Sequence, residues 1–313
     1  MELAKMQQKI TVVICTHNRA NLLLKAIHSI NAAPSLSGSD VSILVIANAC
    51  SDDTLQKLQK LQTDSLQYPL TFEEEPTPGK SFALIRAVNL VPEGFICFID
   101  DDHRVDKNYL TSIQNTINKS PKISMFCGPI FPDWTGLEPS WVHTQGKYKI
   151  SPEPIPCFKI GSKATLITAE TPLPGGGTLI VKKELFAKIG HFSTALGPKG
   201  HNLVGGEDTD FVLRVLNAGE KILYMPDIIQ YHYVDLDRLK LSYLILTSFQ
   251  RTRSFTLVNY PNRSPIPLYM WRKLFNYIFS LLFSFKISKI RFYLIRIAST
   301  TGEMVGFIEG RIR

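Results

Sequence analysis

Acidic residues gather at a point in the sequence where they could hold a cation. Asp100, Asp101 and Asp102 directly follow the apolar run at 95–99. Adjacent carboxylates repel one another unless a cation or abundant water offsets their charge. Oxygen ligands of this kind suit Mg2+ or Mn2+, which can bridge a diphosphate. Taken alone, the triplet is equally compatible with a solvated acidic loop that caps the next helix.

A second acidic group precedes a helix-like run further along the chain. Two glycines lead into Glu207 and Asp208, and the pattern that follows predicts a helix over residues 208–218. A carboxylate there could cap the helix, or it could act as the general base that activates an acceptor hydroxyl. His232 lies between two tyrosines and could complete a metal site, although a lone histidine is more often a packed or hydrogen-bonded residue.

Apolar, β-branched runs in the first hundred residues predict the strands that would position these groups. They alternate with helix-like stretches, as in a parallel sheet that is covered on both faces. In such sheets ligands bind beyond the carboxyl ends of the strands. We therefore expect an α/β fold. The predicted strands span residues 10–15, 41–47, 70–74, 95–99 and 175–181, and the predicted helices 22–30, 53–61, 81–90, 183–189 and 208–218.

The domain organisation is expected to have two parts. Residues 1–236 would form a catalytic domain, with a nucleotide-binding half at 1–128 and an acceptor-binding half at 129–236. Within the second half, residues 129–174 are rich in Pro and Gly and show little periodicity. Residues 237–313 would form a helical, basic and amphipathic extension.

The C-terminal extension carries most of the positive charge of the chain. Residues 271–313 have a net charge of +6, out of +8 for the whole sequence. Their basic residues are interleaved with Leu, Phe, Ile and Tyr. This mixture favours binding to an anionic membrane surface over binding to nucleic acid. The uncharged apolar segment 274–285 is shorter than the roughly 20 residues that a bilayer span needs. An interfacial helix is therefore expected, and the alternative is a helix buried against the catalytic domain or a partner subunit.

The cysteines and the N-terminal residues indicate the cellular compartment in which the protein would be found. The five cysteines are scattered and form no CxxC pair, which is typical of free thiols in a reducing environment. Residues 1–9 are polar and lack the apolar core of a signal peptide, so export is not expected. These features predict a cytoplasmic protein that is peripheral on the inner face of the cell membrane.

Short motifs follow one another in a definite order over residues 10–238. They are Cys15-Thr16-His17-Asn18-Arg19, Asn48-Ala49-Cys50-Ser51-Asp52-Asp53-Thr54, Pro78-Gly79-Lys80-Ser81, Phe98-Ile99-Asp100-Asp101-Asp102, Gly175-Gly176-Gly177, Ile189-Gly190-His191-Phe192, Gly206-Glu207-Asp208, Tyr224-Met225-Pro226 and His232. This order and spacing resembles glycosyltransferase family 2, whose members have the GT-A nucleotide-diphospho-sugar fold.

The resemblance implies a role for each of these positions. Family members often have Asp where this chain has Ala47, and this difference leaves the identity of the donor's nucleobase open. Asp102 and His232 would bind a divalent cation, Mn2+ or Mg2+, and Asp208 would be the catalytic base. The residues expected to contact the nucleotide-sugar donor or the acceptor are Thr16, Asn18, Arg19, Asn48, Lys80, Asp100, Asp101, Gly176, Gly177 and Glu207.

The chemistry that the resemblance implies is an inverting, metal-dependent sugar transfer. The donor would be a nucleotide-sugar, with a UDP-sugar favoured, and the acceptor a saccharide or a lipid-linked molecule of cell-envelope or glycoconjugate synthesis. Two other functions are weighed against it. A nucleotidyltransferase would need a basic, glycine-rich triphosphate loop, which the sequence does not display. A non-catalytic nucleotide-sugar-binding module would not need the full set of acidic residues and His232.

Overall fold

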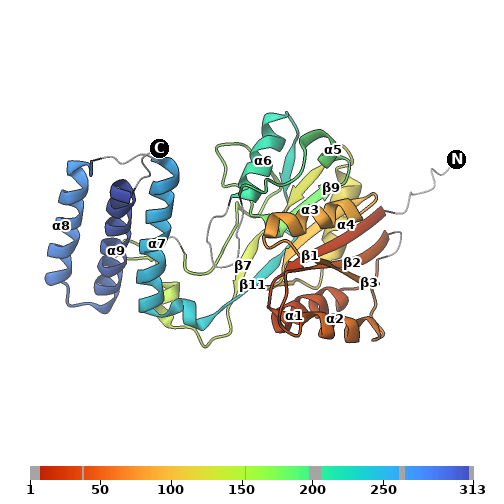
Figure 1. Ribbon diagram of the computed structural model, residues 1–313, viewed down its shortest axis with the longest axis horizontal. Coiled ribbons are helices and arrows are strands. Elements are labelled where there is room, and N and C mark those ends of the chain that lie inside the picture. Colours follow the sequence, from red (N-terminus) through yellow and green to blue (C-terminus); the bar gives the residue numbers. More distant parts are fainter. Residues whose placement is uncertain (1–7, 37–38, 152, 197–205, 261–264, 310–313) are drawn as a thin grey trace. The chain divides into compact units, whose positions relative to one another are not determined.

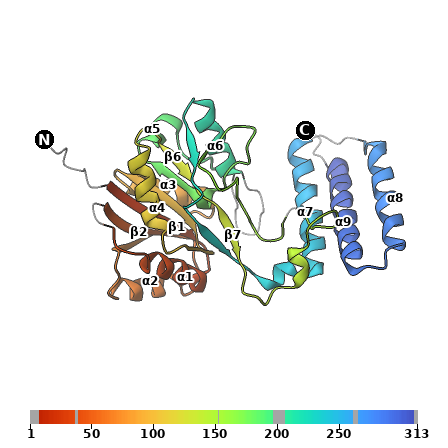
Figure 2. The same cartoon turned by 180° about the vertical axis from the view of Figure 1, so that it is seen from behind.

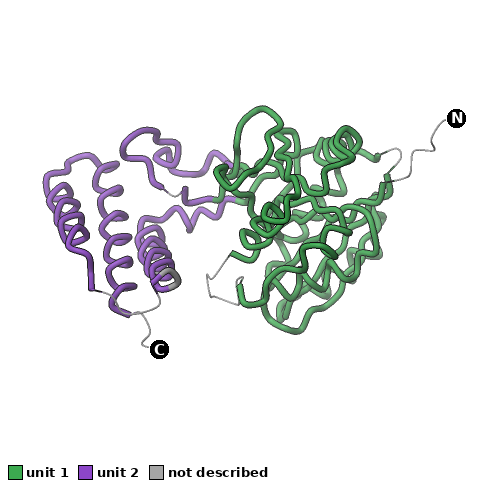
Figure 3. The backbone as a smooth tube through the Cα atoms, turned by 90° about the horizontal axis from the view of Figure 1, so that it is seen from above, with its two compact units in different colours: residues 1–133, 156–233 green, residues 134–155, 234–313 purple. Residues whose placement is uncertain are grey.

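The chain divides into two compact units (Figure 1; Figure 3). Unit 1 comprises residues 1–133 and 156–233, and unit 2 comprises residues 134–155 and 234–313. The structure is a computed structural model that describes residues 8–36, 39–151, 153–196, 206–260 and 265–309. Gly205, the first glycine before Glu207, lies outside the described residues.

Unit 1 is built on an eight-stranded, mostly parallel sheet with the order β3-β2-β1-β4-β9-β6-β10-β8. Strand β9 runs antiparallel to both of its neighbours, and the edge strand β8 is antiparallel to β10. The predicted strands of the first hundred residues are all present. The strands of this sheet are β1 (Gln8–Thr16), β2 (Ser39–Asn48), β3 (Leu70–Glu75), β4 (Phe95–Asp100), β6 (Met125–Cys127), β8 (Thr165–Leu166), β9 (Leu179–Lys182) and β10 (Ile222–Tyr224).

Helices cover both faces of this sheet, because successive strand residues point to opposite sides. In β1, Ile10, Val12 and Ile14 pack into the core on one face, while Val13 belongs to the core on the other face. The α/β class expected from the sequence is confirmed. The first face is covered by α1 (Ala20–Asn31), α2 (Thr54–Gln62) and α4 (Tyr109–Lys119), and the second by α3 (Lys80–Leu90), α5 (Leu185–Ile189) and α6 (Glu207–Asn217).

A second, three-stranded sheet in unit 1 was not predicted from the sequence. Its order is β5-β11-β7, formed by β5 (His103–Val105), β11 (Gln230–Tyr233) and β7 (Ile130–Asp133). Strand β11 is antiparallel to β5 and parallel to β7. These strands are three or four residues long, too short for a hydrophobic period to reveal them. They bring the segment after the acidic triplet beside His232.

Residues 134–155 were expected in the acceptor-binding half of the catalytic domain. In the structure they belong to unit 2. The segment and the chain after β11 share a small apolar cluster. Its members include Trp134, Trp141, Ile155, Val234 and Leu239. This packing joins the segment to the chain that leads into the C-terminal helices. The short 3-10 helices of this region are η1 (Ser140–His143) and η3 (Leu236–Leu239); unit 1 contains η2 (Gly176–Thr178).

The remaining described part of unit 2 contains the helices α7 (Leu241–Asn259), α8 (Leu268–Leu282) and α9 (Ile287–Glu309). Helix α9 lies between the other two, as Figure 1 and Figure 2 show from opposite sides. Two glycines allow α9 to approach α7 closely. A Cβ atom at Gly302 would lie 2.1 Å from the carbonyl oxygen of Phe249, and one at Gly306 would lie 2.6 Å from Cβ of Thr256. None of the described helices is long and apolar enough to cross a bilayer.

Replacing Gly302 by Val should push α9 away from α7 and destabilise unit 2. The new side chain meets backbone, which cannot move aside cheaply, and overpacking of this kind costs about 1–3 kcal/mol or more. Thermal unfolding followed by circular dichroism should show a lower midpoint for the variant. Gly161→Ala is the control, because its added Cβ would meet nothing within 4 Å. Equal midpoints for both variants would show that the α7–α9 contact contributes little.

Candidate active site

A cavity of about 310 Å3 opens at the carboxyl ends of the parallel strands β1, β2 and β4. This is the edge at which open α/β sheets bind their ligands. Eight of the site residues predicted from the sequence line it, which means that the fold brings distant motifs to one place. The lining residues are Cys15, Thr16, His17, Arg19, Asn48, Pro78, Gly79, Lys80, Ala83, Asp100, Asp101, Asp102 and His232.

Asp101 is directed toward the body of unit 1. Its side chain is buried and accepts hydrogen bonds from Thr16 Oγ1 (2.8 Å) and from the Arg19 guanidinium (3.0 Å). Burial raises the pKa of Asp101, and the nearby charge of Arg19 works against that rise. One carboxylate oxygen therefore bonds to the last residue of β1 and the other to the loop that follows it, so Asp101 anchors this loop to the end of β4.

Asp100 forms an ion pair with Lys80, the first residue of α3. Lys80 Nζ lies 2.6 Å from Asp100 Oδ1. Burial alone would raise the pKa of Asp100, but the charge and the hydrogen bond of Lys80 outweigh it and hold this pKa well below its ordinary range. Burial likewise opposes the charge on Lys80, yet Asp100 raises the pKa of the lysine. Both groups are charged at neutral pH.

Asp102, His103 and His232 form a cluster of possible metal ligands, one ligand atom of each lying within 4.8 Å of the others. The pairing of β5 with β11 sets His103 directly opposite His232, and Tyr233 N–H donates to the carbonyl of Asp102 at 2.8 Å. His232 Nε2 lies 3.6 Å from Asp102 Oδ2, and His103 Nε2 lies 3.9 Å from Asp102 Oδ1. Burial lowers the pKa of His232, which favours the neutral imidazole that binds metals. One carboxylate and two imidazoles are ligands that fit a divalent cation.

Asp208 lies beside the glycine segment that precedes β9. Its Oδ2 accepts a hydrogen bond from Gly176 N–H at 2.8 Å, and its Oδ1 accepts one from Thr209 N–H at 2.7 Å. A Cβ atom at Gly177 would come within 2.5 Å of Asp100 Oδ2. The two glycines therefore allow the backbone to run between Asp208 and Asp100, where any side chain would displace a carboxylate.

Glu207, at the start of α6, is a buried carboxylate. Burial raises its pKa; the charge of Lys80 lowers it and that of Asp208 raises it further. The helix starts at a glycine, Gly206, whose φ of 113° suits a residue without a side chain. Glu207 is thus placed within electrostatic reach of the Lys80–Asp100 pair.

The two asparagines expected near the nucleotide are used to fix loops, and Asn48 is the first of them. It donates to the carbonyls of Glu75 (3.1 Å) and Thr77 (2.7 Å) and accepts from Gly79 N–H (2.9 Å). Its amide therefore fastens the loop before α3 to the end of β2, although the residue still lines the cavity.

Asn18 has a positive φ of 53° and accepts hydrogen bonds from the N–H groups of Ser51 (2.7 Å) and Asp52 (3.2 Å). It joins the loop after β1 to the loop after β2. Asn18 is not among the residues that line the cavity.

Two histidines of the site had no role assigned in the sequence analysis. His103 directly follows the acidic triplet, but its value as a ligand depends on the pairing of two short strands. His17 lines the cavity, and its Nδ1 donates to the carbonyl of Asn48 at 2.7 Å. Nothing in the spacing of the sequence distinguishes either residue from an ordinary surface or core histidine.

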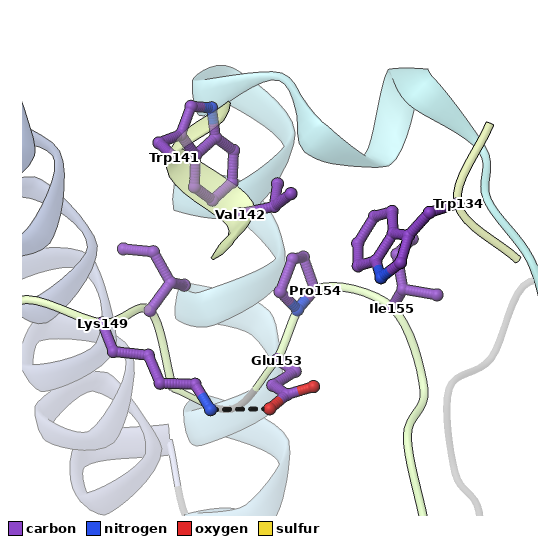
Figure 4. A pocket seen from close by; sticks show the side chains of 8 residues that line it. Trp134, Trp141, Val142, Lys149, Glu153, Pro154 and Ile155 are labelled. Atoms are coloured by element: carbon purple, nitrogen blue, oxygen red, sulfur yellow. Dashed lines mark hydrogen bonds and ion pairs between the residues drawn. The ribbon is translucent and has the colours of Figure 1, made fainter. Parts of the chain in front are cut away.

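A much smaller hollow of about 20 Å3 lies within unit 2 (Figure 4). Trp134, Trp141 and Ile155 form apolar parts of its wall, and Lys149 Nζ forms an ion pair with Glu153 Oε1 at 2.7 Å. Its volume is that of about one water molecule, so a nucleotide-sugar does not fit there.

Comparison with known proteins agrees with this geometry. Residues 11–186, more than half of the chain, match the model of the family described as glycosyl transferase family 2. A glucosyl-dolichyl phosphate glucuronosyltransferase of Haloferax volcanii is 21% identical over 261 residues, which are 82% of this chain and 80% of that protein.

Two solved structures share the fold. A mannosyltransferase of Pyrobaculum calidifontis, PcManGT, in complex with GDP-Man and Mn2+, has a TM-score of 0.55 and 16% identity, covering 94% of this chain and 70% of its own. GalNAc-T7 with UDP, GalNAc and Mn2+ has a TM-score of 0.55 and 15% identity, covering 80% of this chain and 51% of its own. The chain belongs to glycosyl transferase family 2 and is a glycosyltransferase with the GT-A fold.

Proposed function

We propose that this glycosyltransferase moves a sugar, with inversion, from a nucleotide-sugar donor to a hydroxyl of a saccharide or lipid-linked acceptor. The observation that carries the proposal is the cavity at the ends of β1, β2 and β4, where Lys80, Asp100, Asp102 and His232 come together. Its volume of about 310 Å3 is within the range of small-ligand sites. The relative from Haloferax is named for a lipid-phosphate acceptor, which supports the same acceptor class here.

The donor is proposed to bind with its diphosphate near Lys80 and the Asp102–His232 pair. Asp102 and His232 would hold a divalent cation, Mn2+ or Mg2+, which when bound offsets the negative charge of the leaving diphosphate. Mn2+ accompanies GDP-Man in one related structure and UDP in another. A UDP-sugar remains the favoured donor, and GDP is the alternative to test beside it.

Asp208 is proposed as the base. Its carboxylate would take the proton of the acceptor hydroxyl while the acceptor oxygen bonds to the anomeric carbon and the bond from that carbon to the diphosphate breaks. The hydrogen bond from Gly176 N–H holds Asp208 in one orientation. Attack from the side opposite the diphosphate inverts the configuration of the sugar.

Calorimetry should detect UDP binding that strengthens when Mn2+ is added. Asp102→Ala removes a proposed ligand, so the affinity gained from Mn2+ should fall by at least about tenfold, or about 1.4 kcal/mol. Asp133→Asn is the control, since Asp133 pairs with Arg104 and does not line the cavity. GDP is titrated in parallel. If neither diphosphate binds in the presence of Mn2+, the donor-site proposal is wrong.

Asp208→Asn should keep donor binding and lose transfer. Removing a general base lowers turnover by roughly 10²–10⁴-fold, measured as labelled sugar moved from the donor into a lipid-saccharide fraction. Asp210→Asn is the matched control on the same helix, because Asp210 pairs with Arg214. Equal activity of Asp208→Asn and the unmodified protein would remove Asp208 from the role of base.

Helix α8 of unit 2 is proposed to rest on an anionic membrane surface. Trp271, Phe275, Phe279 and Leu282 recur along one side of the helix and are each more than half exposed. A large exposed apolar surface on a soluble protein usually marks an interaction site. Aromatic side chains of this kind favour the interfacial region of a bilayer.

The charge around α8 is complementary to anionic lipid. Residues 268–302 contain six Lys or Arg and no acidic residue. A negative membrane surface attracts such residues by about 1 kcal/mol each. The helix has 15 residues and is therefore about 22 Å long, which suits an orientation in the plane of the interface better than one across the bilayer.

The full chain should sediment with vesicles that contain phosphatidylglycerol more than with pure phosphatidylcholine, and less so at high salt. The double variant Phe275→Ser/Phe279→Ser should bind these vesicles at least about tenfold more weakly, because two inserted rings are lost. Leu137→Ser is the control, as Leu137 is 76% exposed but outside α8. Unchanged vesicle binding, or a change in self-association alone, would argue against the membrane proposal and for a protein partner.

A further inference from the structure

His103 faces the same space as the two proposed cation ligands and had no role in the sequence analysis. Its side chain is buried, and its ring centroid lies 5.1 Å from that of His232. The two histidines are opposite one another in the antiparallel pair β5–β11, an arrangement that brings cross-strand side chains together on one face.

Hydrogen bonds fix the same tautomer in both rings. His232 Nδ1 lies 2.6 Å from the carbonyl oxygen of Tyr233, which can only accept, so this nitrogen carries the proton. His103 Nδ1 lies 2.8 Å from Gln230 Oε1, which also can only accept. In the neutral form of each ring Nε2 therefore carries a lone pair, and both Nε2 atoms are on the side of Asp102.

Asp102, His103 and His232 therefore face one another without a hydrogen bond between the carboxylate and either imidazole. Neither Nε2 is within hydrogen-bond distance of the Asp102 carboxylate, since the separations are 3.6 and 3.9 Å. Arg19 Nη1 donates to Asp102 Oδ2 at 3.1 Å, but it offers nothing to the two imidazole nitrogens. Two imidazole lone pairs and a carboxylate that face one another repel unless a cation lies among them. Resting on the cation site of the proposed function, we propose that His103 is a third cation ligand beside Asp102 and His232, and that Gln230 is the positioning residue that holds it.

Gln230 is built into the core of unit 1. Its side chain is fully buried, and its Nε2 donates to the hydroxyl of Tyr109 at 3.1 Å, which leaves Oε1 for His103. Gln230 and His232 are two residues apart in β11, so their side chains are on the same face of the strand. An outer hydrogen bond of this kind orients a metal-bound imidazole, and its loss typically costs about 10–100-fold in metal affinity.

The ligand set also selects among cations. Mg2+ prefers oxygen ligands, whereas Mn2+ and later transition metals accept imidazole readily. Two imidazoles and one carboxylate therefore favour Mn2+ over Mg2+. Asp102 and His232 with water in place of His103 would discriminate less.

The first test compares His103→Asn with the unmodified protein. Asparagine can keep a donor near the position of Nδ1 for Gln230 but has no counterpart of Nε2. Mn2+ binding in the presence of UDP is followed by the loss of the free-ion signal in electron paramagnetic resonance, and nitrogen coupling is read by spin-echo modulation. We expect Mn2+ affinity to fall at least about tenfold, Mg2+ affinity to fall less, and the coupling to drop from two imidazoles to one. His191→Asn serves as the control histidine.

The second test separates positioning from folding. Gln230→Met removes the acceptor at similar volume and should lower Mn2+ affinity about tenfold or more, while Gln230→Glu restores an acceptor and should recover it. Near-ultraviolet circular dichroism confirms that each variant is folded. Unmodified Mn2+ affinity and nitrogen coupling in His103→Asn, or equal affinities for Gln230→Met and Gln230→Glu, would overturn this inference alone. Absence of Mn2+ binding by the unmodified protein would overturn the proposed cation site with it.

Discussion

Three consecutive carboxylates at the carboxyl end of β4 repel one another, and the surrounding elements offset that repulsion with cationic and hydrogen-bonding partners. Lys80, at the start of α3, neutralises Asp100. Thr16, the last residue of β1, and Arg19, just before α1, satisfy the buried Asp101. Asp102 is left facing two imidazoles and one edge of the Arg19 guanidinium. The order of the strands suits this need, because β1 lies next to β4 and the small sheet continues directly from the triplet.

The loops around the cavity are held by side chains that do not need to touch a ligand. Asn48 ties the segment before Lys80 to the end of β2, and Asn18 ties two strand-to-helix loops together. Such anchoring keeps the cationic and anionic groups in place before a substrate arrives, which lowers the cost of ordering them on binding. Gly177 has a related effect, since its missing side chain leaves room for Asp100.

The sequence was sufficient for the elements whose periodicity is strong and for residues in recognisable motifs. The strands near Val13, Val45 and Phe98 and the helices between them could be predicted because their apolar runs are long. The β5–β11–β7 sheet could not, because its strands are short and the β5–β11 pairing joins residues more than a hundred positions apart. For the same reason the sequence pattern did not identify His103 as a possible metal ligand. The position of residues 134–155 depends on tertiary packing around Trp141, which periodicity does not encode.

The ion pair between Arg19 and Asp102 has a consequence for how the cleft is charged. Arg19 Nη1 lies 3.0 Å from Asp101 Oδ1 and 3.1 Å from Asp102 Oδ2, so one guanidinium group offsets the charge of both carboxylates. A guanidinium also binds phosphate oxygens well, and Arg19 lines the cavity. Arg19 is therefore a resident counterion that the cleft holds before any cation or diphosphate arrives.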